Sequence, residues 1–377
     1  MKLIHLGDLH IGKRVNEFSM LEDQEFILAR ILSVIEDEQP DGVLLAGDIY
    51  DKTVPSAEAV ALFDRFLVRL ARLGPAVFMI SGNHDSPERI AFGGRLMEQS
   101  RVYVSPIFDG HIKSVLLKEG TRQARIYLLP FVKPAQVRHY LDESVTDYNQ
   151  AMEACIREMK VNPEEINILV AHQFVTGAIQ CESEELSVGG TDNVDFEVFE
   201  PFDYVALGHL HGPQQVGRET IRYAGSPLKY SFSERNQVKS VTVVEIERKG
   251  RIGVRQVPLT PRRDLREIRG TYAELTMRDN YAGTNVEDYL RVILTDENEV
   301  MDALAKLRII YPNIMRLEYD NTRTRTNSVL LADEAVQEKS RLELLDELYE
   351  IQNGVPLSEA QRKYAEDVFE LIREGES

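Results

Sequence analysis

Short apolar runs alternate with helical patterns through residues 1–258, and this alternation constrains the fold more than any other feature. The runs at 43–46 and 168–171 are apolar at every position. Strands without a polar face are typical of sheets that are covered on both sides. The order strand, helix, strand therefore predicts an α/β fold built around layered sheets.

The same patterns place the individual elements of this first part. Strands are expected at residues 2–6, 43–46, 76–81, 125–129, 167–171, 204–207 and 239–246. Helices are expected at residues 20–37, 56–73, 87–97 and 145–160. Two prolines and a charged run at 258–264 predict a domain boundary.

The remainder of the chain divides into two smaller parts. Residues 265–320 predict a small α/β unit with strands at 265–269, 289–294 and 314–319 and a helix at 299–310. Residues 333–377 predict a helical hairpin with helices at 333–351 and 358–373, the second opened by a capping box of Ser358 and Gln361. An isolated hairpin cannot bury both of its apolar stripes, so it should dock either on its own chain or on a partner.

Composition and charge exclude several classes of protein. The chain has 377 residues, 43% of them hydrophobic and 28% charged, which is ordinary for a globular protein. No stretch approaches the roughly 20 apolar residues of a membrane span, and the start MKLIHLGD does not resemble a signal peptide. The two cysteines, Cys155 and Cys181, lack metal-ligand spacing, so a reducing cytoplasmic setting is expected. The net charge of −18 argues against tight DNA binding by this chain without bound cations or a second subunit.

Five short motifs follow predicted strands, at the strand ends where open α/β sheets place their ligands. They are GDLH at 7–10, GDIYD at 47–51, GNHD at 82–85, AH at 171–172 and GHLH at 208–211. Most of the eight histidines of the chain lie in these motifs. A single histidine at a strand end is usually a structural polar residue, but five motifs in register indicate a common site.

The residue types in these motifs predict a site for two metal ions. Asp, Asn and His supply oxygen and nitrogen ligands that suit Mn²⁺, Fe²⁺, Zn²⁺ or Mg²⁺. A carboxylate such as Asp48 can bridge two cations through its two oxygens. Because only Asp8 and Asp48 among the ligands are anionic, two divalent ions would leave about two positive charges for an anionic phosphodiester.

The motifs resemble those of the calcineurin-like metallophosphoesterases, and most closely those of the SbcD-type nucleases that act on DNA double-strand breaks. The segments that carry the resemblance are GDLHIGK, GDIYDK, GNHDSPER, AHQF, GHLHGPQ and YAGSPLKYSFSE. The resemblance covers nearly the whole chain. It implies a layered β-sandwich nuclease domain at 1–258 flanked by helices, a capping domain at 265–320 and a helical hairpin at 333–377.

The resemblance also implies the ligands of each metal ion. One ion would be held by Asp8, His10, Asp48 and His211. The other would share Asp48 and be held in addition by Asn83, His172 and His209.

Further roles come from the same resemblance. His84 matches the catalytic histidine, which does not bind metal but contacts the scissile phosphate and protonates or stabilises the leaving 3′ oxygen. Asp85 would orient that ring, although a carboxylate that only stabilises the turn is an equal alternative. Asp51 would support Asp48 from outside the ligand set. Lys229 and Arg235 could contact DNA phosphates or lie on a solvated face.

Members of the family use manganese and cut DNA as double-strand exonucleases and as single-strand or hairpin endonucleases. The resemblance implies a homodimer and a heterotetramer of two nuclease chains with two SbcC-type coiled-coil ATPase chains, the ATPase holding the C-terminal hairpin. The helices at 56–73 and 87–97 occupy the place of the dimer interface. Their apolar residues, Phe63, Phe66, Leu67 and Leu70, could equally belong to the core.

Two other functions remain open from the sequence. The same metal site could serve a small-molecule phosphomonoesterase or cyclic-nucleotide phosphodiesterase. A non-catalytic subunit that tethers DNA is the other alternative. The metal positions show no departure from the family pattern, which argues against an inactive descendant.

Overall fold

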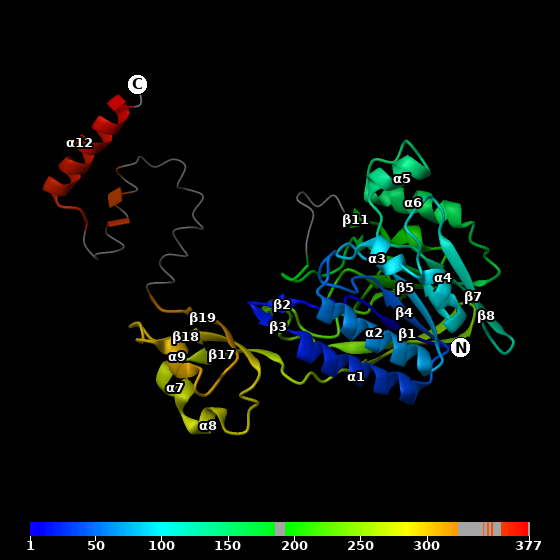
Figure 1. Cartoon of the computed structure of the whole chain (residues 1–377). Coiled ribbons are helices and arrows are strands. Elements are labelled where there is room, and N and C mark those ends of the chain that lie inside the picture. Colours follow the sequence, from blue (N-terminus) through cyan, green and yellow to red (C-terminus); the bar gives the residue numbers. More distant parts are fainter. Residues whose placement is uncertain (185–192, 323–341, 343–344, 347, 350–355, 376–377) are drawn as a thin grey trace. The chain divides into compact units, whose positions relative to one another are not determined.

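The chain forms two compact units in the computed structural model (Figure 1). The structure describes all residues except 185–192, 323–341, 343–344, 347, 350–355 and 376–377. The first unit comprises Met1–Glu267 and Glu287–Arg291, and the second comprises Ile268–Val286 and Val292–Ser377.

Two six-stranded sheets form the framework of the first unit. One sheet has the order β16-β15-β1-β4-β5-β6 and consists of β1 (Lys2–Leu6), β4 (Gly42–Ala46), β5 (Ala76–Ile80), β6 (Val102–Val104), β15 (Ser240–Arg248) and β16 (Arg251–Pro258). The other has the order β13-β14-β12-β9-β8-β7 and consists of β7 (Lys113–Glu119), β8 (Arg122–Leu128), β9 (Ile166–His172), β12 (Tyr204–Gly208), β13 (Gln214–Val216) and β14 (Arg218–Tyr223). Within each sheet the inner strands run parallel, so their carboxyl ends share one edge.

The two sheets pack face to face around a common core. Its buried side chains come from β1, β4 and β5 of one sheet and from β8, β9 and β12 of the other. Leu3, Leu44 and Phe78 belong to the first group, and Ile126 and Ile168 to the second. The expected layered β-sandwich is therefore confirmed, and the apolar runs without a polar face are the strands buried between layers.

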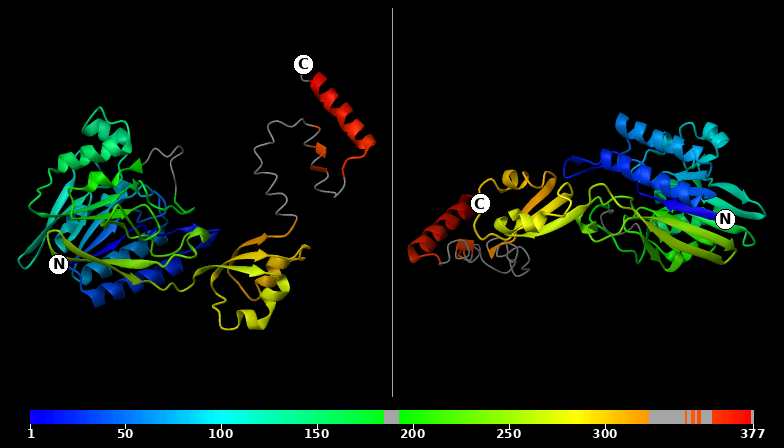
Figure 2. Two further views of the ribbon diagram at one scale, coloured as in Figure 1. Left: turned by 180° about the vertical axis from the view of Figure 1, so that it is seen from behind. Right: turned by 90° about the horizontal axis from the view of Figure 1, so that it is seen from below.

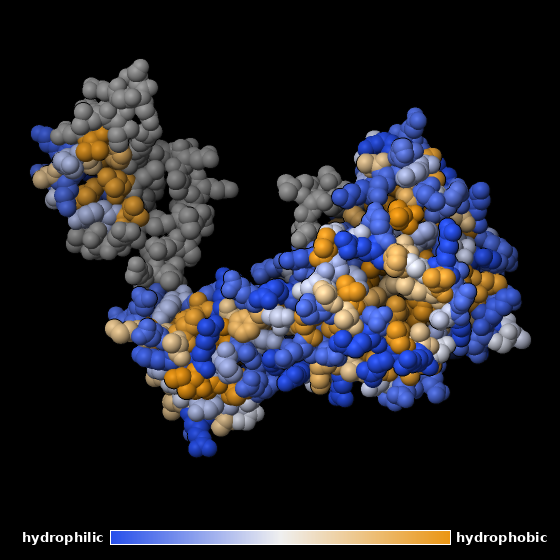
Figure 3. Space-filling model, in the orientation of Figure 1, coloured by the Kyte–Doolittle hydropathy of each residue, from blue (hydrophilic) through white to orange (hydrophobic). Residues whose placement is uncertain are grey.

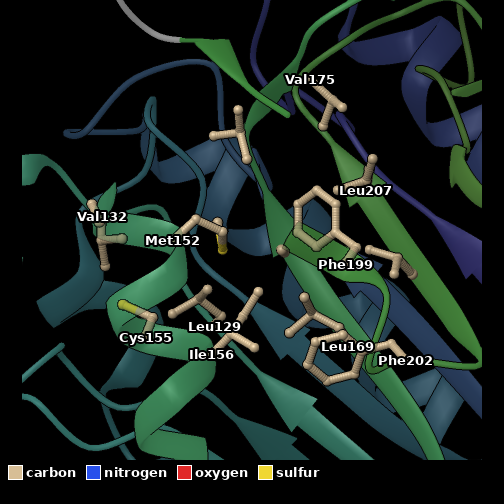
Figure 4. Close-up of a cluster of buried hydrophobic side chains, with 14 of the residues drawn as sticks. Leu129, Val132, Met152, Cys155, Ile156, Leu169, Val175, Phe199, Phe202 and Leu207 are labelled. Atoms are coloured by element: carbon tan, nitrogen blue, oxygen red, sulfur yellow. The ribbon is translucent and has the colours of Figure 1, made fainter. Parts of the chain in front are cut away.

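Helices cover the outer faces of the sandwich. Figures 1 and 2 show α1 (Leu21–Glu38) and α2 (Ala57–Arg72) on the side of the sheet that contains β1 and β4. On the opposite side, α5 (Pro134–Tyr140) and α6 (Tyr148–Met159) cover the second sheet. Met152, Cys155 and Ile156 of α6 pack against Leu169 of β9 (Figure 4). Cys155 is fully buried in this layer, so its side chain serves as a small apolar residue of the core.

The prediction of one continuous helix at residues 87–97 is wrong. The structure instead has α3 (Pro87–Ala91) and α4 (Gly94–Met97), followed by a 3₁₀ turn, η1 (Glu98–Ser100). Gly93 separates the two helices with a φ of 72°, a left-handed conformation that glycine adopts without steric cost. The side chains of Phe92 and Leu96 in this segment are 82% and 74% exposed, and Figure 3 shows apolar surface over this part of the unit.

Smaller elements complete the first unit. They are the strand pairs β2 (Arg14–Val15) with β3 (Phe18–Ser19) and β10 (Phe174–Val175) with β11 (Asn193–Val194), and the 3₁₀ turns η2 (Phe196–Phe199) and η3 (Phe232–Glu234). None of the described helices is both long enough and apolar enough to cross a membrane.

A three-stranded sheet with the order β17-β18-β19 follows the sandwich along the chain. Its strands are β17 (Leu265–Gly270), β18 (Tyr289–Leu294) and β19 (Ile314–Tyr319), and its short helices are α7 (Tyr272–Thr276), α8 (Arg278–Tyr281) and α9 (Ala303–Leu307). The expected helix at 299–310 is therefore shorter than predicted, whereas the three strands lie where the pattern placed them.

Near the C-terminus, α12 (Glu359–Gly375) corresponds to the second helix of the predicted hairpin. Its capping box is confirmed, because the amide of Ser358 donates to Gln361 Oε1 at 3.0 Å and the amide of Gln361 donates to Ser358 Oγ at 3.4 Å. Most of the first predicted helix, at 333–351, lies outside the described residues.

Candidate metal centre

The five predicted motifs meet at the shared edge of the two sheets. The loop after β1 contacts the loop after β4, since the amide of His10 donates to the carbonyl of Asp48 at 2.9 Å. Four of the predicted ligands have positive φ values, which are uncommon outside glycine: Asp8 (53°), His10 (44°), Asp48 (48°) and His209 (105°). Backbone strain of this kind is typical of functional sites.

The first ligand group consists of Asp8, His10 and His211, all buried, whose ligand atoms lie within 4.8 Å of one another. The Nε2 atoms of His10 and His211 are 3.1 Å apart. Asp8 Oδ1 accepts the amide proton of His209, but the buried Oδ2 has no hydrogen-bond partner. A buried carboxylate oxygen beside two imidazole nitrogens is a donor set that fits a divalent cation.

The second ligand group forms around the side-chain oxygen of Asn83. This oxygen lies 2.9 Å from His172 Nε2 and 3.1 Å from His209 Nδ1. Close approach of the strands is needed here, because a Cβ atom added to Gly208 would lie 2.7 Å from His172 Nδ1. The group supplies one oxygen and two nitrogens, which again suits a borderline divalent cation.

Asp48 links the two groups through a single oxygen. Its Oδ2 lies 3.6 Å from His10 Nε2 and 3.3 Å from His172 Nε2. The other oxygen, Oδ1, accepts the amide proton of His84 at 3.0 Å. One oxygen therefore faces both ligand groups, and the other fixes the loop that carries His84. Bridging of two cations by Asp48 stays a prediction.

Burial keeps two of the histidines in the form that binds metal. It lowers the pKa of His10 well below its usual value and, together with the charge of His172, lowers the pKa of His209 to about 3. Both rings are therefore neutral at pH 7 and retain a lone pair for a cation. Burial would also lower the pKa of His172, but the adjacent Asp48 carboxylate raises it to about 9.

His84 lies beside the ligand groups, and one of its ring nitrogens is within 4.8 Å of ligand atoms of His10 and Asp48. Its Nδ1 is 3.1 Å from the carbonyl oxygen of Asp51, and its ring centroid is 4.9 Å from that of His10. The Asp51 carboxylate accepts a hydrogen bond from Lys13 Nζ at 2.7 Å and lies 3.7 Å from His10 Nδ1. Asp51 thus contacts His10 and His84, whereas the sequence predicted that Asp51 would support Asp48.

Asp85 does not orient the His84 ring. Its carboxylate accepts three backbone N–H groups, from Ile49, Tyr50 and Gly82, at 2.9–3.0 Å. These bonds join the loop after β4 to the loop after β5. The turn-stabilising alternative is therefore the one that the structure supports, and the catalytic role predicted for Asp85 is corrected.

Lys229 and Arg235, the predicted DNA contacts, have protein partners in the first unit. Lys229 Nζ donates to the Asp264 carboxylate at 3.0 Å and to the carbonyl of Arg235 at 2.8 Å. Arg235 Nη1 donates to the carbonyl of Phe232 at 3.2 Å. Both side chains line a cavity of about 350 Å³. Lys229 connects two segments of the protein, and Arg235 is the more exposed of the two cations.

Several residues that support the centre were missed from the sequence. Gln24 Nε2 donates to the carbonyl of His10 at 2.7 Å, and Tyr230 Oη donates to that of Leu9 at 2.6 Å. Behind His211 lies a second set of polar side chains, of which Glu234 and Lys239 are buried and Ser183 and Glu184 are partly buried. Glu234 closes the stretch YAGSPLKYSFSE, but its neighbours Ser233 and Arg235 give no indication of a contact with His211.

Comparison with known proteins gives the family of the chain. Residues 1–213 match the model of the calcineurin-like phosphoesterases, and residues 261–353 match that of the type 5 capsule protein repressor C-terminal domain. A protein of Staphylococcus epidermidis, named as the SbcD subunit of nuclease SbcCD, is 36% identical over 84% of this chain and 85% of its own length. Its namesake from Staphylococcus saprophyticus is 32% identical over the full length of both chains.

The chain belongs to the SbcD family of calcineurin-like phosphoesterases. The match to the phosphoesterase model extends through the GHLH motif, so it includes all five motifs and every predicted ligand. Among solved structures, a dimetal phosphatase from Danio rerio is 10% identical, with a TM-score of 0.39 over 69% of this chain and 99% of that chain. This SbcD-family chain is a metal-dependent hydrolase with a candidate site for two divalent cations.

Proposed function

We propose that this SbcD-family chain is a nuclease subunit that uses two Mn²⁺ ions to hydrolyse DNA phosphodiester bonds. The observation that carries the proposal is the pair of ligand groups that share Asp48 beside the side chain of His84. Relatives named as the SbcD subunit of nuclease SbcCD support DNA as the substrate. The expected reactions are those of a double-strand exonuclease and a single-strand or hairpin endonuclease.

The residues of the centre would divide the work of hydrolysis. Bound cations would supply positive charge to the phosphodiester and lower the pKa of a water molecule. Asp8, His10, Asp48 and His211 would hold one ion, and Asp48 with Asn83, His172 and His209 the other. His84 Nδ1 lies 3.1 Å from the Asp51 carbonyl oxygen, which only accepts, so Nδ1 carries a proton. The doubly protonated ring would donate its Nε2 proton to the leaving 3′ oxygen and be left neutral with its proton on Nδ1.

The experiment that tests this proposal is digestion of end-labelled duplex and hairpin DNA in the presence of Mn²⁺. We expect shortening of the duplex and opening of the hairpin, and neither in the presence of a chelator. A small phosphate ester serves as the competing substrate. Turnover of that ester with the DNA left whole would support a small-molecule phosphoesterase and overturn the nuclease proposal.

The proposed partner is an SbcC-type coiled-coil ATPase, in a heterotetramer of two nuclease and two ATPase chains. The names of the relatives describe them as one subunit of an SbcCD nuclease, which supports a second component. The described part of α12 also leaves Tyr364 73% exposed, as expected for a helix that contacts a partner.

Deleting residues 333–377 is expected to end co-purification with the ATPase while Mn²⁺-dependent cleavage of short DNA stays close to that of the full chain. The reason is that every predicted metal ligand, together with His84, lies before residue 212. Pull-down with the co-expressed ATPase and an oligonucleotide cleavage assay measure the two effects. Association retained by the truncated chain would contradict this role of the C-terminal segment.

The proposed homodimer would use the face that carries α3 and α4. Phe63 and Phe66 of α2 are buried in their own chain, so the core alternative holds for them. Phe92 and Leu96 are instead largely exposed and offer an apolar surface. A cytoplasmic location is proposed as well, because both cysteines are free thiols.

A further inference from the structure

A chain of hydrogen bonds leads away from His211, on the side of the ring that faces away from His10. His211 Nδ1 lies 2.8 Å from Ser183 Oγ, and that hydroxyl donates to Glu234 Oε1 at 2.6 Å. The other oxygen of Glu234 accepts a hydrogen bond from Lys239 Nζ at 2.5 Å. His211, Glu234 and Lys239 are all at least 96% buried, so water does not compete for the bond between Glu234 and Lys239, whereas Ser183 is partly buried.

The position of the protons in this chain follows from the chemistry of the groups. An ionised carboxylate only accepts hydrogen bonds, so the single hydroxyl proton of Ser183 points to Glu234. The oxygen of Ser183 must then accept its second bond, which places a proton on His211 Nδ1. His211 Nε2 is thereby left without a proton, and this is the atom that lies 3.1 Å from His10 Nε2 in the first ligand group.

We propose that Ser183 and Glu234 are positioning residues that fix the tautomer and orientation of His211 and strengthen its Nε2 as a metal ligand. The direct distance from His211 Nδ1 to Glu234 Oε1 is 3.5 Å, too long for a strong bond, so the hydroxyl of Ser183 is the effective link. This inference rests on the proposed metal centre. Outer partners of ligating histidines commonly fix the ring in this manner.

Lys239 and Glu184 complete the support of the same ligand. Lys239 Nζ donates to the carbonyl oxygen of His211 at 2.8 Å and neutralises Glu234. Glu184 accepts the amide proton of His211 at 2.6 Å. The side chain and both backbone polar groups of His211 are thus held. Two of the supporting residues come from one segment, Cys181–Glu184, whose position is set in part by a bond from the amide of Glu182 to Ser233 Oγ at 3.1 Å.

The test compares Ser183→Thr with Ser183→Val. Threonine and valine have nearly the same volume, but threonine has a hydroxyl group where valine has a methyl group. Mn²⁺ binding to the full-length protein is measured by calorimetry and by electron paramagnetic resonance. S183V is expected to lose about 10–100-fold in affinity at one of the two sites and to leave the other unchanged. S183T is expected to bind both ions as the wild type does, because its hydroxyl restores the link.

Ser233→Ala is the matched control, since it removes a hydroxyl that holds the same segment but does not contact His211. Equal weakening by S183V and S183T, or no weakening by either, would overturn the inference. A wild-type protein that does not bind two ions would instead overturn the proposed function, so the two failures are distinguishable. If S183V does not fold, nitrogen NMR of His211 in the metal-free wild type decides: a proton on Nδ1 supports the inference, and a proton on Nε2 contradicts it.

Discussion

Replacing His84 with alanine is expected to lower Mn²⁺-dependent DNA cleavage by about 10²–10⁴-fold, the range that a general acid contributes, while two Mn²⁺ ions remain bound. The bond that His84 makes to Asp48 comes from its backbone amide, so an alanine at this position keeps it. The ring itself contacts the carbonyl of Asp51 and the edge of His10. Parallel measurements of single-turnover cleavage and metal stoichiometry separate the chemical step from metal binding.

Metal stoichiometry in H84A decides between two roles for this ring. A nitrogen of His84 lies within 4.8 Å of ligand atoms of His10 and Asp48, so the ring could also serve as a ligand. Loss of one ion in H84A would assign it that role. Unchanged cleavage would place the chemistry elsewhere and favour a non-catalytic DNA-tethering subunit. His111→Ala is the control, because that side chain is 83% exposed and belongs to none of the five motifs.

The sequence predicted which side chains meet at the candidate metal centre, because strand ends are the easiest part of this fold to recognise. Uninterrupted apolar runs mark the inner parallel strands, and parallel strands must end at a common edge. Residues that follow those runs, such as Asp8, Asn83 and His172, are therefore expected to meet. The structure confirms that they do.

Patterns of apolar residues could not predict which residues support the ligands. Ser183 and Glu234 are 51 positions apart, and nothing in the local sequence of either one indicates a contact with His211. Edge strands were missed for a related reason: β7 and β16 expose much of their surface, and their apolar residues form no run longer than three. The break at Gly93 was missed because the helical pattern continues across it.

Asp85 shows a different limit of the sequence. A carboxylate next to a catalytic histidine suggests that it orients the ring, yet its oxygens accept backbone amides of two loops. Burial and the nearby Asp48 raise the pKa of Asp85 to about 6. The position of Asp85 next to His84 in the sequence therefore did not predict its contacts, because the Asp85 carboxylate bonds to the loop backbone and not to the His84 ring.

Replacing Asp48 with asparagine is expected to weaken binding of both metal ions and to reduce cleavage below detection. The affected atom is Oδ2, which lies 3.6 Å from His10 Nε2 and 3.3 Å from His172 Nε2 and so faces both ligand groups. Asparagine keeps the shape of the side chain but removes one of the two negative charges among the ligands. Affinity should therefore fall by more than the roughly 10–100-fold caused by loss of an outer partner.

Calorimetric titration with Mn²⁺ measures both sites of D48N in one experiment, and Asp64→Asn serves as the control because Asp64 lies on the exposed face of α2. Loss of only one ion would show that Asp48 belongs to a single site and that the two ligand groups are independent. Joint loss would show that one oxygen holds the pair together. In that case the strained backbone at Asp48, with its φ of 48°, has a physical reason, since it places this oxygen where both groups of histidines can reach the same carboxylate.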